Sequence, residues 1–217
     1  MRRYFAECLG TFILVFCGTG AIMINHEMGG IITHPGVAAT FGLVVMVLIY
    51  TLGDVSGCHI NPAVTIAFTI AGRFPPARLL PYIASQLAGA LLASLLLRAL
   101  FPANATLGST LPVGPALRAG IIEFFLSFFL MLVIMRAATG SKEQGLFAGV
   151  AIGATVLLEA LFAGPVTGAS MNPARSLAPA VISGHTEYLW LYLVVTTAGM
   201  ALAVFAWKGL HLKTGGK

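Results

Sequence analysis

The chain carries two short motifs whose residue types suit the binding of a small polar molecule. They are Asn61, Pro62 and Ala63, and, 111 residues later, Asn172, Pro173 and Ala174. Proline is favoured at the first position of a helix, where its missing N–H has no partner to lose. The N-terminus of a helix presents unpaired N–H groups and a partial positive charge of about half an electron. Each motif therefore predicts a helix end at which N–H donors and an asparagine amide face a polar molecule.

The two motifs belong to a longer internal repeat. Residues 55–63 (VSGCHINPA) match residues 166–174 (VTGASMNPA) at the same offset. A glutamate stands inside the first apolar run of each half, Glu7 in one and Glu123 in the other. Self-similarity at a fixed offset indicates repeated structural units. We therefore expect that residues 1–217 form one domain. That domain would contain a first repeat over about 1–102 and a second repeat over about 113–212.

Composition places the chain in a membrane. Of the 217 residues, 58% are hydrophobic and only 9% are charged, against roughly 25% charged in an ordinary soluble domain. Apolar runs that approach the roughly 20 residues needed to cross a bilayer occur at six places. They cover about 4–24, 37–52, 79–100, 116–137, 146–162 and 188–207. The apolar segments that open at the two motifs are too short to cross, so we interpret them as half-membrane helices.

The number of spans determines how the two halves are related. Each half has three spans, an odd number, so the second half must be inverted relative to the first. One half-membrane helix then enters from each side, and the two can meet near the midplane, where inverted-repeat transport proteins place their pathway. The sequence therefore predicts an all-α membrane protein with six transmembrane helices and two re-entrant half-helices in an inverted repeat.

Basic residues predict the orientation, because Lys and Arg are enriched on the cytoplasmic side of a membrane protein. With six spans both termini share one side, and nine basic residues fall there against three on the other side. The nine are Arg2, Arg3, Arg73, Arg78, Arg136, Lys142, Lys208, Lys213 and Lys217, and the three are Arg98, Arg118 and Arg175. We therefore expect a multi-pass protein of the cell (inner) membrane with both termini in the cytoplasm.

The same residues argue against several other classes of protein. The formal net charge is +5, but the basic residues are scattered and form no stripe with interleaved aromatics, so no nucleic-acid partner is expected. Cys8, Cys17 and Cys58 have no CxxC spacing, which argues against a disulfide framework and against a zinc site. The sequence has no nucleophile–base pair and no set of metal ligands. We therefore expect neither an enzyme nor a metal or cofactor site.

Two Asn-Pro-Ala triplets in register, six spans and an arginine directly after the second triplet, Arg175, resemble the aquaporin superfamily over essentially the whole chain. The resemblance implies the aquaporin fold and a passive channel for water and small uncharged solutes in the lipid bilayer. It also implies a homotetramer with four separate pores. A water-selective aquaporin is the alternative within the family. An ion-coupled secondary transporter is the main alternative outside it, since such transporters share inverted repeats and broken helices.

Within the superfamily, residues 42–50 (GLVVMVLIY) and 163–177 (AGPVTGASMNPARSL) are similar to the nodulin-like intrinsic proteins, including bacterial members. That resemblance implies a pore for glycerol, water and neutral metalloid acids such as arsenous, boric or silicic acid. Three residues depart from the family patterns. Phe41 stands where the group more often has tryptophan, glycine or alanine, and Asp54 replaces a common histidine, so the solute ranking and the regulation stay open. Ser176 stands where glycerol facilitators typically carry aspartate, which argues against a dedicated glycerol channel.

The resemblance also assigns the narrowest part of the pore. In the family, the arginine after the second triplet lies at the outer constriction, and the spacing from the two asparagines places Phe41, Ala160 and Ala169 beside Arg175. Arg175 would donate to a solute oxygen, Phe41 would form an apolar wall, and the two alanines would leave room. Strict water channels usually carry a histidine at the position of Ala160, so a wider opening is expected. A phenylalanine packed against lipid or a neighbouring helix is the simpler interpretation of Phe41.

The two triplets suggest how such a pore would exclude protons. Facing helix ends at mid-membrane repel cations, including hydronium. Asn61 and Asn172 would both donate to the oxygen of one passing molecule, which interrupts the hydrogen-bonded chain that a proton needs. Asparagines that only cap buried helices are the simpler interpretation.

Three glutamates could serve either structure or transport. Glu7 and Glu123 are expected to brace the two pore loops by accepting N–H groups, with His59 as a neighbour of Glu7, whereas ion coupling is the alternative role. Glu159 could line the pore, bond to the second loop, or stay protonated because burial disfavours its charge.

Cys58 lies three residues before Asn61, as Ala169 lies three residues before Asn172. The symmetry of the repeat therefore predicts that Cys58 lies beside the lumen on the cytoplasmic side. A small residue that fills space in an apolar region is the simpler interpretation of a buried cysteine.

Overall fold

A computed structural model describes residues 1–140 and 145–210, and every regular element in them is a helix. The elements are α1 (Arg2–Glu27), α2 (Thr33–Ser56), α3 (Pro62–Ile70), the 3-10 helix η1 (Pro76–Arg78), α4 (Leu79–Leu100), α5 (Ala116–Thr139), α7 (Ala148–Thr167), α8 (Pro173–Ser183) and α9 (Leu189–Leu210). Six segments are long and apolar enough to cross a membrane: α1, α2, α4 with η1, α5, α7 and α9. The prediction of an all-α chain with six spans and two shorter helices is confirmed. Lys142, Lys213, Lys217 and the predicted end of the second repeat at 212 lie outside the described residues.

The largest difference from the predicted boundaries is the end of α7. This helix continues through Pro165 to Thr167 instead of ending near residue 162. A proline inside a helix leaves the carbonyl four residues earlier without its N–H donor. Here His34 at the start of α2 donates from Nε2 to that carbonyl, Leu161 O, at 2.7 Å. The neighbouring helix therefore supplies the hydrogen bond that α7 lacks, and the helix can pass the proline.

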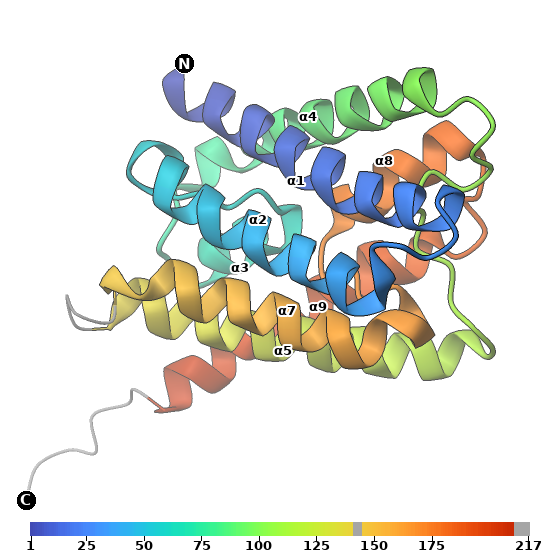
Figure 1. Ribbon diagram of the computed structural model, residues 1–217. Coiled ribbons are helices and arrows are strands. Elements are labelled where there is room, and N and C mark those ends of the chain that lie inside the picture. The colour runs from blue at the N-terminus through green and yellow to red at the C-terminus, as the bar shows by residue number, and fades with distance from the viewer. Residues whose placement is uncertain (141–144, 211–217) are drawn as a thin grey trace, which may run out of the picture.

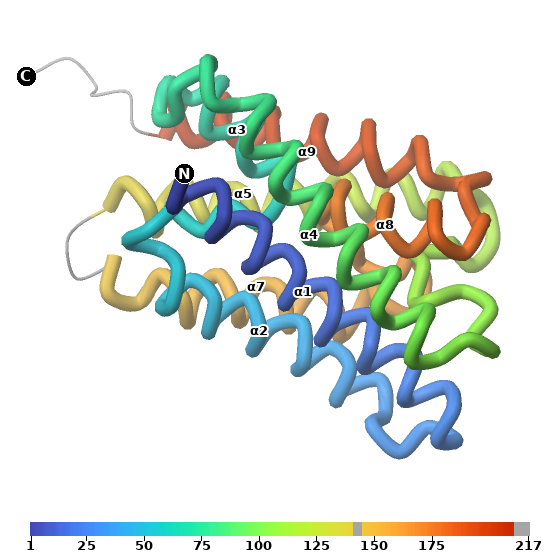
Figure 2. The backbone as a smooth tube through the Cα atoms, turned by 90° about the horizontal axis from the view of Figure 1, so that it is seen from above, coloured from blue at the N-terminus to red at the C-terminus, as the bar shows by residue number. Residues whose placement is uncertain are grey.

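The six long helices form a bundle around the two short ones (Figure 1). Helix α3 lies toward one end of the bundle and α8 toward the other, and the view from above agrees (Figure 2). The N-terminus and the end of α9 lie at the same end as α3. Helix α1 packs mainly against α4 and α2, α2 against α7, and α5 against α9. Two short helices that occupy opposite ends are the arrangement that an inverted repeat requires.

Glycines occupy the closest helix crossings, and they recur at equivalent places in the two halves. A Cβ built on Gly89 of α4 would lie 2.0 Å from a carbonyl oxygen of α1, and one built on Gly199 of α9 would lie 2.3 Å from a carbonyl oxygen of α5. Neither distance leaves room for a side chain. Small residues allow helix backbones to approach closely in a membrane, where packing drives association.

Two tyrosines make equivalent hydrogen bonds in the two halves. Each donates to the last residue of the long helix that precedes a short helix. Tyr82 of α4 donates from its hydroxyl to Ser56 O, the last residue of α2, at 2.9 Å. Tyr192 of α9 donates to Thr167 O, the last residue of α7, at 2.6 Å. The repeat read from the sequence is therefore also present in the hydrogen bonds that hold the loops before α3 and α8.

Candidate functional site

Asn61 and Asn172 cap the first turns of α3 and α8. The Oδ1 atom of Asn61 accepts the Ala63 N–H at 2.9 Å. The Oδ1 atom of Asn172 accepts the N–H groups of Ala174 and Arg175 at 3.0 and 3.3 Å. Because each amide oxygen is occupied by a helix end, each NH2 group must point away from its own helix.

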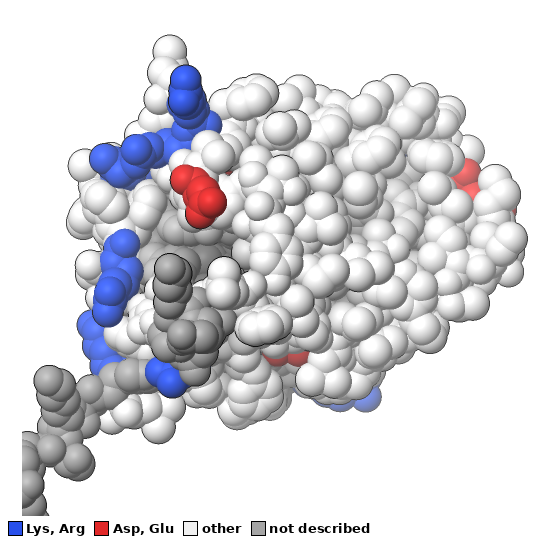
Figure 3. Space-filling view, turned by 60° about the vertical axis from the view of Figure 1, so that its left-hand side comes forward, with Lys and Arg blue, Asp and Glu red and all other residues white. Residues whose placement is uncertain are grey.

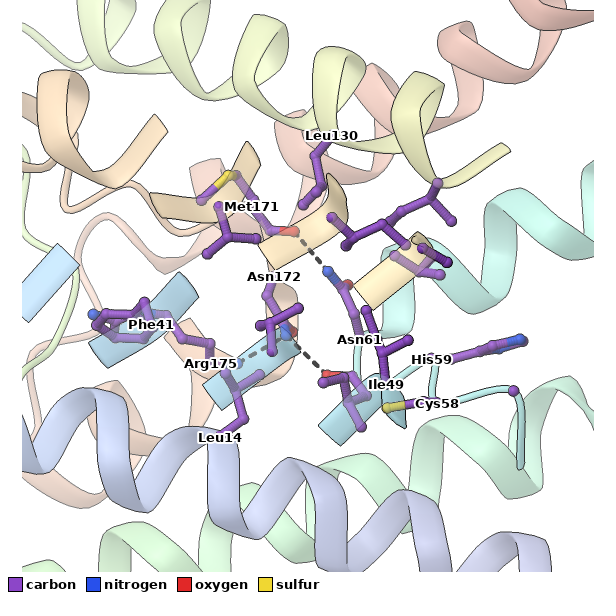
Figure 4. Close-up of a pocket in the computed structure, with 18 of the residues that line it drawn as sticks. Leu14, Phe41, Ile49, Cys58, His59, Asn61, Leu130, Met171, Asn172 and Arg175 are labelled. Carbon is purple, nitrogen blue, oxygen red and sulfur yellow. Dashed lines mark hydrogen bonds between the residues drawn. The ribbon is translucent and has the colours of Figure 1, made fainter. Parts of the chain in front are cut away.

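The two NH2 groups join the halves of the molecule. Asn61 Nδ2 donates to Met171 O at 2.8 Å, and Asn172 Nδ2 donates to Ile60 O at 2.9 Å (Figure 4). Each amide nitrogen carries two hydrogens, so each asparagine keeps a second donor after this bond is made. Both asparagines line one cavity at the centre of the bundle. The arrangement places two helix N-termini and two amide donors at one point of that cavity.

The loops before the two short helices have an unusual backbone at equivalent positions. Cys58 and Ile60 in the first loop have φ values of 47° and 43°, and Ala169 and Met171 in the second have 40° and 52°. Residues with a side chain adopt this left-handed region at a cost of about 1–2 kcal/mol each. Such a backbone persists only where its surroundings hold it in place.

Glu7 holds the first loop. Its carboxylate is fully buried and accepts hydrogen bonds from Ser56 Oγ at 2.7 Å, His59 N at 2.9 Å, Ile60 N at 2.7 Å and Gln86 Nε2 at 2.7 Å. The two backbone donors belong to the strained part of the loop. Buried carboxylates need such partners, and here the partners are the loop itself.

Glu123 occupies the same role in the second half. It is fully buried and accepts the N–H groups of Ser170 at 2.9 Å and Met171 at 3.0 Å. The second loop is further held by hydroxyl groups: Ser170 Oγ and Ser176 Oγ lie 2.5 Å apart, and Thr110 Oγ1 donates to Ser176 Oγ at 2.8 Å. The second loop is therefore bonded to Glu123 of α5 and, through Ser176, to Thr110 in the segment between α4 and α5.

His59 contacts Glu7 through its backbone, and its ring does not reach that carboxylate. The ring nitrogen Nδ1 lies 3.1 Å from Thr65 Oγ1, and the ring stacks on Phe68 with 4.9 Å between centroids. Figure 4 shows the ring pointing away from the two asparagines. The predicted contact with Glu7 therefore exists, but it uses the backbone N–H, which every residue type except proline would supply.

Two cavities follow one another along the bundle. The central cavity is lined by both asparagines, and the outer cavity by residues that include His34 and Ala160. Three residues line both cavities, and they are Phe41, Ala169 and Arg175. These three therefore form the junction between the cavities, with Ala160 on its outer side.

Arg175 is held rigidly at this junction. It is only 2% exposed, and its Nη1 donates to Gly108 O at 2.8 Å. Its guanidinium carbon lies 5.0 Å from the centroid of the Phe41 ring, within the range of a cation–π contact. Its Nε is buried and has no hydrogen-bond partner among the described residues. A guanidinium carries five N–H donors, so Arg175 keeps donors besides the one that binds Gly108 O, at a point that both cavities share.

Cys58 also lines the central cavity. It is 8% exposed, and its backbone N–H donates to Ser56 Oγ at 3.1 Å. Figure 4 shows its sulfur between the first loop and Ile49, on the Asn61 side of the cavity. The thiol is therefore next to the lumen and on the far side of the asparagines from Arg175.

Glu159 is the exception among the glutamates. It is 3% exposed, and neither carboxylate oxygen has a hydrogen-bond partner among the described residues. It is not among the residues that line the two cavities, and it makes no bond to the second loop. An unpaired buried charge is costly, so of the three alternatives the neutral acid fits this environment best.

Several residues of the site carried no clear signal in the sequence. Gln86, a polar residue within an apolar run, donates to Glu7 and also to Thr65 Oγ1 at 2.9 Å. Gly108 and Thr110 belong to a loop between spans, where no pattern marks them. Among the described residues, no group of three or more His, Cys, Asp or Glu side chains could hold a metal ion.

Comparisons with known proteins agree on one family. Residues 1–207 match the family model described as "Major intrinsic protein". The chain is 47% identical over 200 residues to nodulin-26 from Glycine max, covering 92% of this chain and 74% of that protein. It is 44% identical over 213 residues to aquaporin NIP1-2 from Oryza sativa subsp. japonica, covering 95% of this chain and 70% of that protein.

A solved structure shows the same fold. The X-ray structure of the aquaglyceroporin from Plasmodium falciparum superposes with a TM-score of 0.85 at 24% sequence identity. The match covers 94% of this chain and 93% of the other. At that identity the likeness concerns the arrangement of the helices, including the two short ones.

Proposed function

The chain belongs to the major intrinsic protein family, and from that premise we propose that its pore passes glycerol and neutral metalloid acids, such as arsenous, boric and silicic acid, as well as water. Members of the family are channels for water and small uncharged solutes, not enzymes, and this chain is such a multi-pass membrane channel. The relatives named above lie in the nodulin-26 group, which supports the wider solute range. A bacterial origin within that group is part of the same proposal.

The observation that carries the proposal is the junction formed by Phe41, Ala169 and Arg175, with Ala160 beside it. We propose that these four residues form the selectivity constriction. Arg175 offers a fixed cationic donor to a solute oxygen, and Phe41 offers an apolar face to the carbon or metalloid side of the solute. The two alanines occupy positions where larger side chains would fill the opening. A junction with two small alanines and one fixed donor would favour polar solutes larger than water.

Exclusion of protons and ions follows, in this proposal, from the centre of the pore. The N-termini of α3 and α8 both present partial positive charge there, and Arg175 adds a full charge farther out. The remaining amide hydrogens of Asn61 and Asn172 can both bind the oxygen of one water molecule. That molecule cannot then pass a proton along a hydrogen-bonded chain. Glu7 and Glu123 support a passive channel over an ion-coupled transporter, because their oxygens are occupied by the loops.

We further propose a homotetramer, one domain per chain in two repeats, and an orientation with both termini in the cytoplasm of the cell (inner) membrane. The basic residues support the orientation, since they gather at the end of the bundle that holds the N-terminus (Figure 3). The helix ends at this end of the bundle carry basic residues: the start of α1, the segment from the end of α3 to η1, and the end of α9, with Arg2, Arg3, Arg73, Arg78 and Lys208. A cytoplasmic location is usual for such a cluster.

The test is flux through the purified protein in liposomes. Water, glycerol, urea and arsenous acid would be compared with protein-free liposomes, and we expect water, glycerol and arsenous acid to exceed that background. Conduction of water alone would favour the water-selective alternative. Dependence of solute flux on a proton or sodium gradient would favour a transporter.

A variant tests the constriction itself. Ala160→His should lower glycerol and arsenous acid flux roughly tenfold or more and water flux less than about twofold, because the larger side chain fills the opening to a larger solute first. Ala151→His, on the exposed face of the same helix, is the matched control and should change neither flux. An equal loss for water and glycerol, or no loss at all, would show that Ala160 does not border the constriction.

A further inference from the structure

Helix α1 presents a stripe of residues to the pore, and the stripe has a gap. Leu14 lines the central cavity, and Ile22, two turns later on the same face, lines the outer cavity. The residue between them, one turn from each, is Gly18. Side chains four residues apart lie above one another on a helix. The gap therefore falls at the level of the junction between the cavities.

The ring of Phe41 fills the space that a side chain at Gly18 would take. A Cβ built on Gly18 would lie 2.2 Å from Cε1, 2.5 Å from Cζ and 2.8 Å from Cδ1 of Phe41. These distances are far below van der Waals contact, so one partner would have to move. The three atoms belong to the far end of a side chain with two rotatable bonds. The ring can therefore move where a helix backbone could not.

The surroundings of Phe41 determine the direction of that movement. The ring lies where a Cβ on Gly18 of α1 would be. It also lies 5.0 Å, from its centroid, from the guanidinium carbon of Arg175, and Figure 4 shows these two side chains together. Arg175 is fixed by its bond to Gly108 O. Since the ring lines both cavities, a push from α1 moves it away from the helix and into the lumen.

We infer that Gly18 is a positioning residue for the selectivity constriction: by having no side chain it lets Phe41 lie back against α1, and so it sets the width of the pore. The inference rests on the proposed function of Phe41 and extends it to a residue that does not itself touch the solute. Any side chain at position 18 should narrow the channel for larger solutes while leaving the helix bundle intact.

A matched pair of variants tests this inference. Gly18→Ala and Gly20→Ala make the same chemical change two residues apart in α1. A Cβ at Gly20 would lie 3.4 Å from Leu97 Cδ2, an ordinary contact, and would meet no pore residue. Both changes raise helix propensity equally. Any difference between the two variants therefore reports on Phe41 and not on the stability of α1.

Water and glycerol flux would be measured in proteoliposomes with each variant, with Phe41→Ala and with the double variant Gly18→Ala, Phe41→Ala. We expect Gly18→Ala to lower the glycerol-to-water flux ratio roughly tenfold, as expected when a ring is forced into a narrow passage. Gly20→Ala should leave the ratio unchanged. The double variant should recover the ratio of Phe41→Ala alone, because the ring that transmits the effect is gone.

The outcomes separate the inference from the function on which it rests. If Phe41→Ala raises the glycerol ratio but Gly18→Ala does not lower it, the constriction stands and the inference is wrong. If Phe41→Ala has no effect, both the constriction and the inference are wrong. If Gly18→Ala lowers both fluxes equally and removal of the ring restores neither, the glycine serves helix packing, which also overturns the inference. Thermal unfolding of each purified variant shows whether the fold was kept.

Discussion

The junction near Arg175 and the matching region near the first loop occupy equivalent positions of the repeat but are built from different side chains. The offset of 111 residues pairs Phe41 with Ile152, Ile49 with Ala160, Cys58 with Ala169, and Val64 with Arg175. Ile49, Cys58, Val64 and Ile152 all line the central cavity. One end of the pore therefore carries a cation and an aromatic ring, whereas the other is apolar. The fold provides two similar ends, and we propose that the four side chains of the constriction make only one of them selective for a solute.

The two glutamates that hold the loops also differ in their hydrogen-bond partners. Glu7 receives a hydrogen bond from Gln86, and the offset of 110 residues between the paired tyrosines of α4 and α9 puts Thr196 at the equivalent place in the second half. The Thr196 hydroxyl donates to Tyr192 O at 2.5 Å and not to Glu123. The other contacts are matched, because His59 Nδ1 lies 3.1 Å from Thr65 Oγ1 in the first half as Ser170 Oγ lies 2.5 Å from Ser176 Oγ in the second. The difference between the halves is therefore the bond from Gln86 to the Glu7 carboxylate.

We expect the largest effect on stability from substituting these two glutamates. Glu7→Gln places an NH2 group among buried donors, and each donor left without an acceptor costs about 1–3 kcal/mol. We expect Glu7→Gln to lower the free energy of unfolding by about 2–3 kcal/mol or more, and Glu123→Gln by less, because the bond from Gln86 to Glu7 has no counterpart from Thr196 to Glu123. Unfolding of the purified variants in detergent measures both, with the exposed Glu187→Gln as control. Equal losses would mean that the two loops are held alike.

Arg175→Val would give the outer junction the side chain that Val64 supplies at the equivalent position. Removal of the fixed charge should allow cations or protons to leak, whereas the intact protein should show no channel-dependent conductance. Water flux should stay within about twofold, since the shorter side chain does not narrow the pore. Ion conductance and osmotic shrinking would be recorded on the same liposomes. A proton current in the unaltered protein comparable with its solute flux would refute the proposed barrier.

Thiols at the paired positions 58 and 169 can distinguish the two ends of the pore. A membrane-permeant mercurial should block the unaltered channel at Cys58, and Cys58→Ser should abolish the block. An impermeant reagent added outside should act slowly, because it must first pass the junction. In the double variant Cys58→Ser, Ala169→Cys, the same impermeant reagent should act at once. Block that persists in Cys58→Ser would place the reactive thiol elsewhere.

The smallest effect is expected at Glu159, whose equivalent in the first half is the buried Leu48. If the carboxyl is neutral, Glu159→Gln is nearly isosteric and should change the free energy of unfolding by less than about 1 kcal/mol. Flux should likewise be unchanged and independent of pH between roughly 5 and 8, because the group carries no charge to lose. A clear gain in stability on substitution would instead show that the protein carries a buried charge there.

The fold could be predicted from the sequence because its determinants are local or repeated. Apolar runs of the right length give the spans, and Pro62 and Pro173 give the starts of the short helices. The end of α7 could not be predicted in this way. The apolar run ends near residue 162, but the helix continues past Pro165 because His34, far away in the sequence, replaces the missing hydrogen bond.

The candidate site likewise contains contacts that the sequence predicts and contacts that it does not. The approach of the two Asn-Pro-Ala triplets follows from an inverted repeat, and the cross-bonds from Asn61 and Asn172 are its expression in the structure. The tether from Gly108 to Arg175 and the packing of Phe41 on Gly18 have no such origin. The first contact depends on a backbone carbonyl and the second on a missing side chain, each in a distant segment. A single sequence does not show which carbonyl or which glycine makes such a contact.

The cross-bonds between the two asparagines and the opposite loops also impose an order on biosynthesis. Ile60 O and the Asn61 amide find their partners only when Asn172 and Met171 have been made, 112 and 110 residues later. At about 5–20 residues per second that interval is roughly 6–22 s. During this time the first re-entrant segment is inserted with its loop incomplete. We expect that the last half-helix to be synthesised closes both loops at once, so that the pore forms in a single late step.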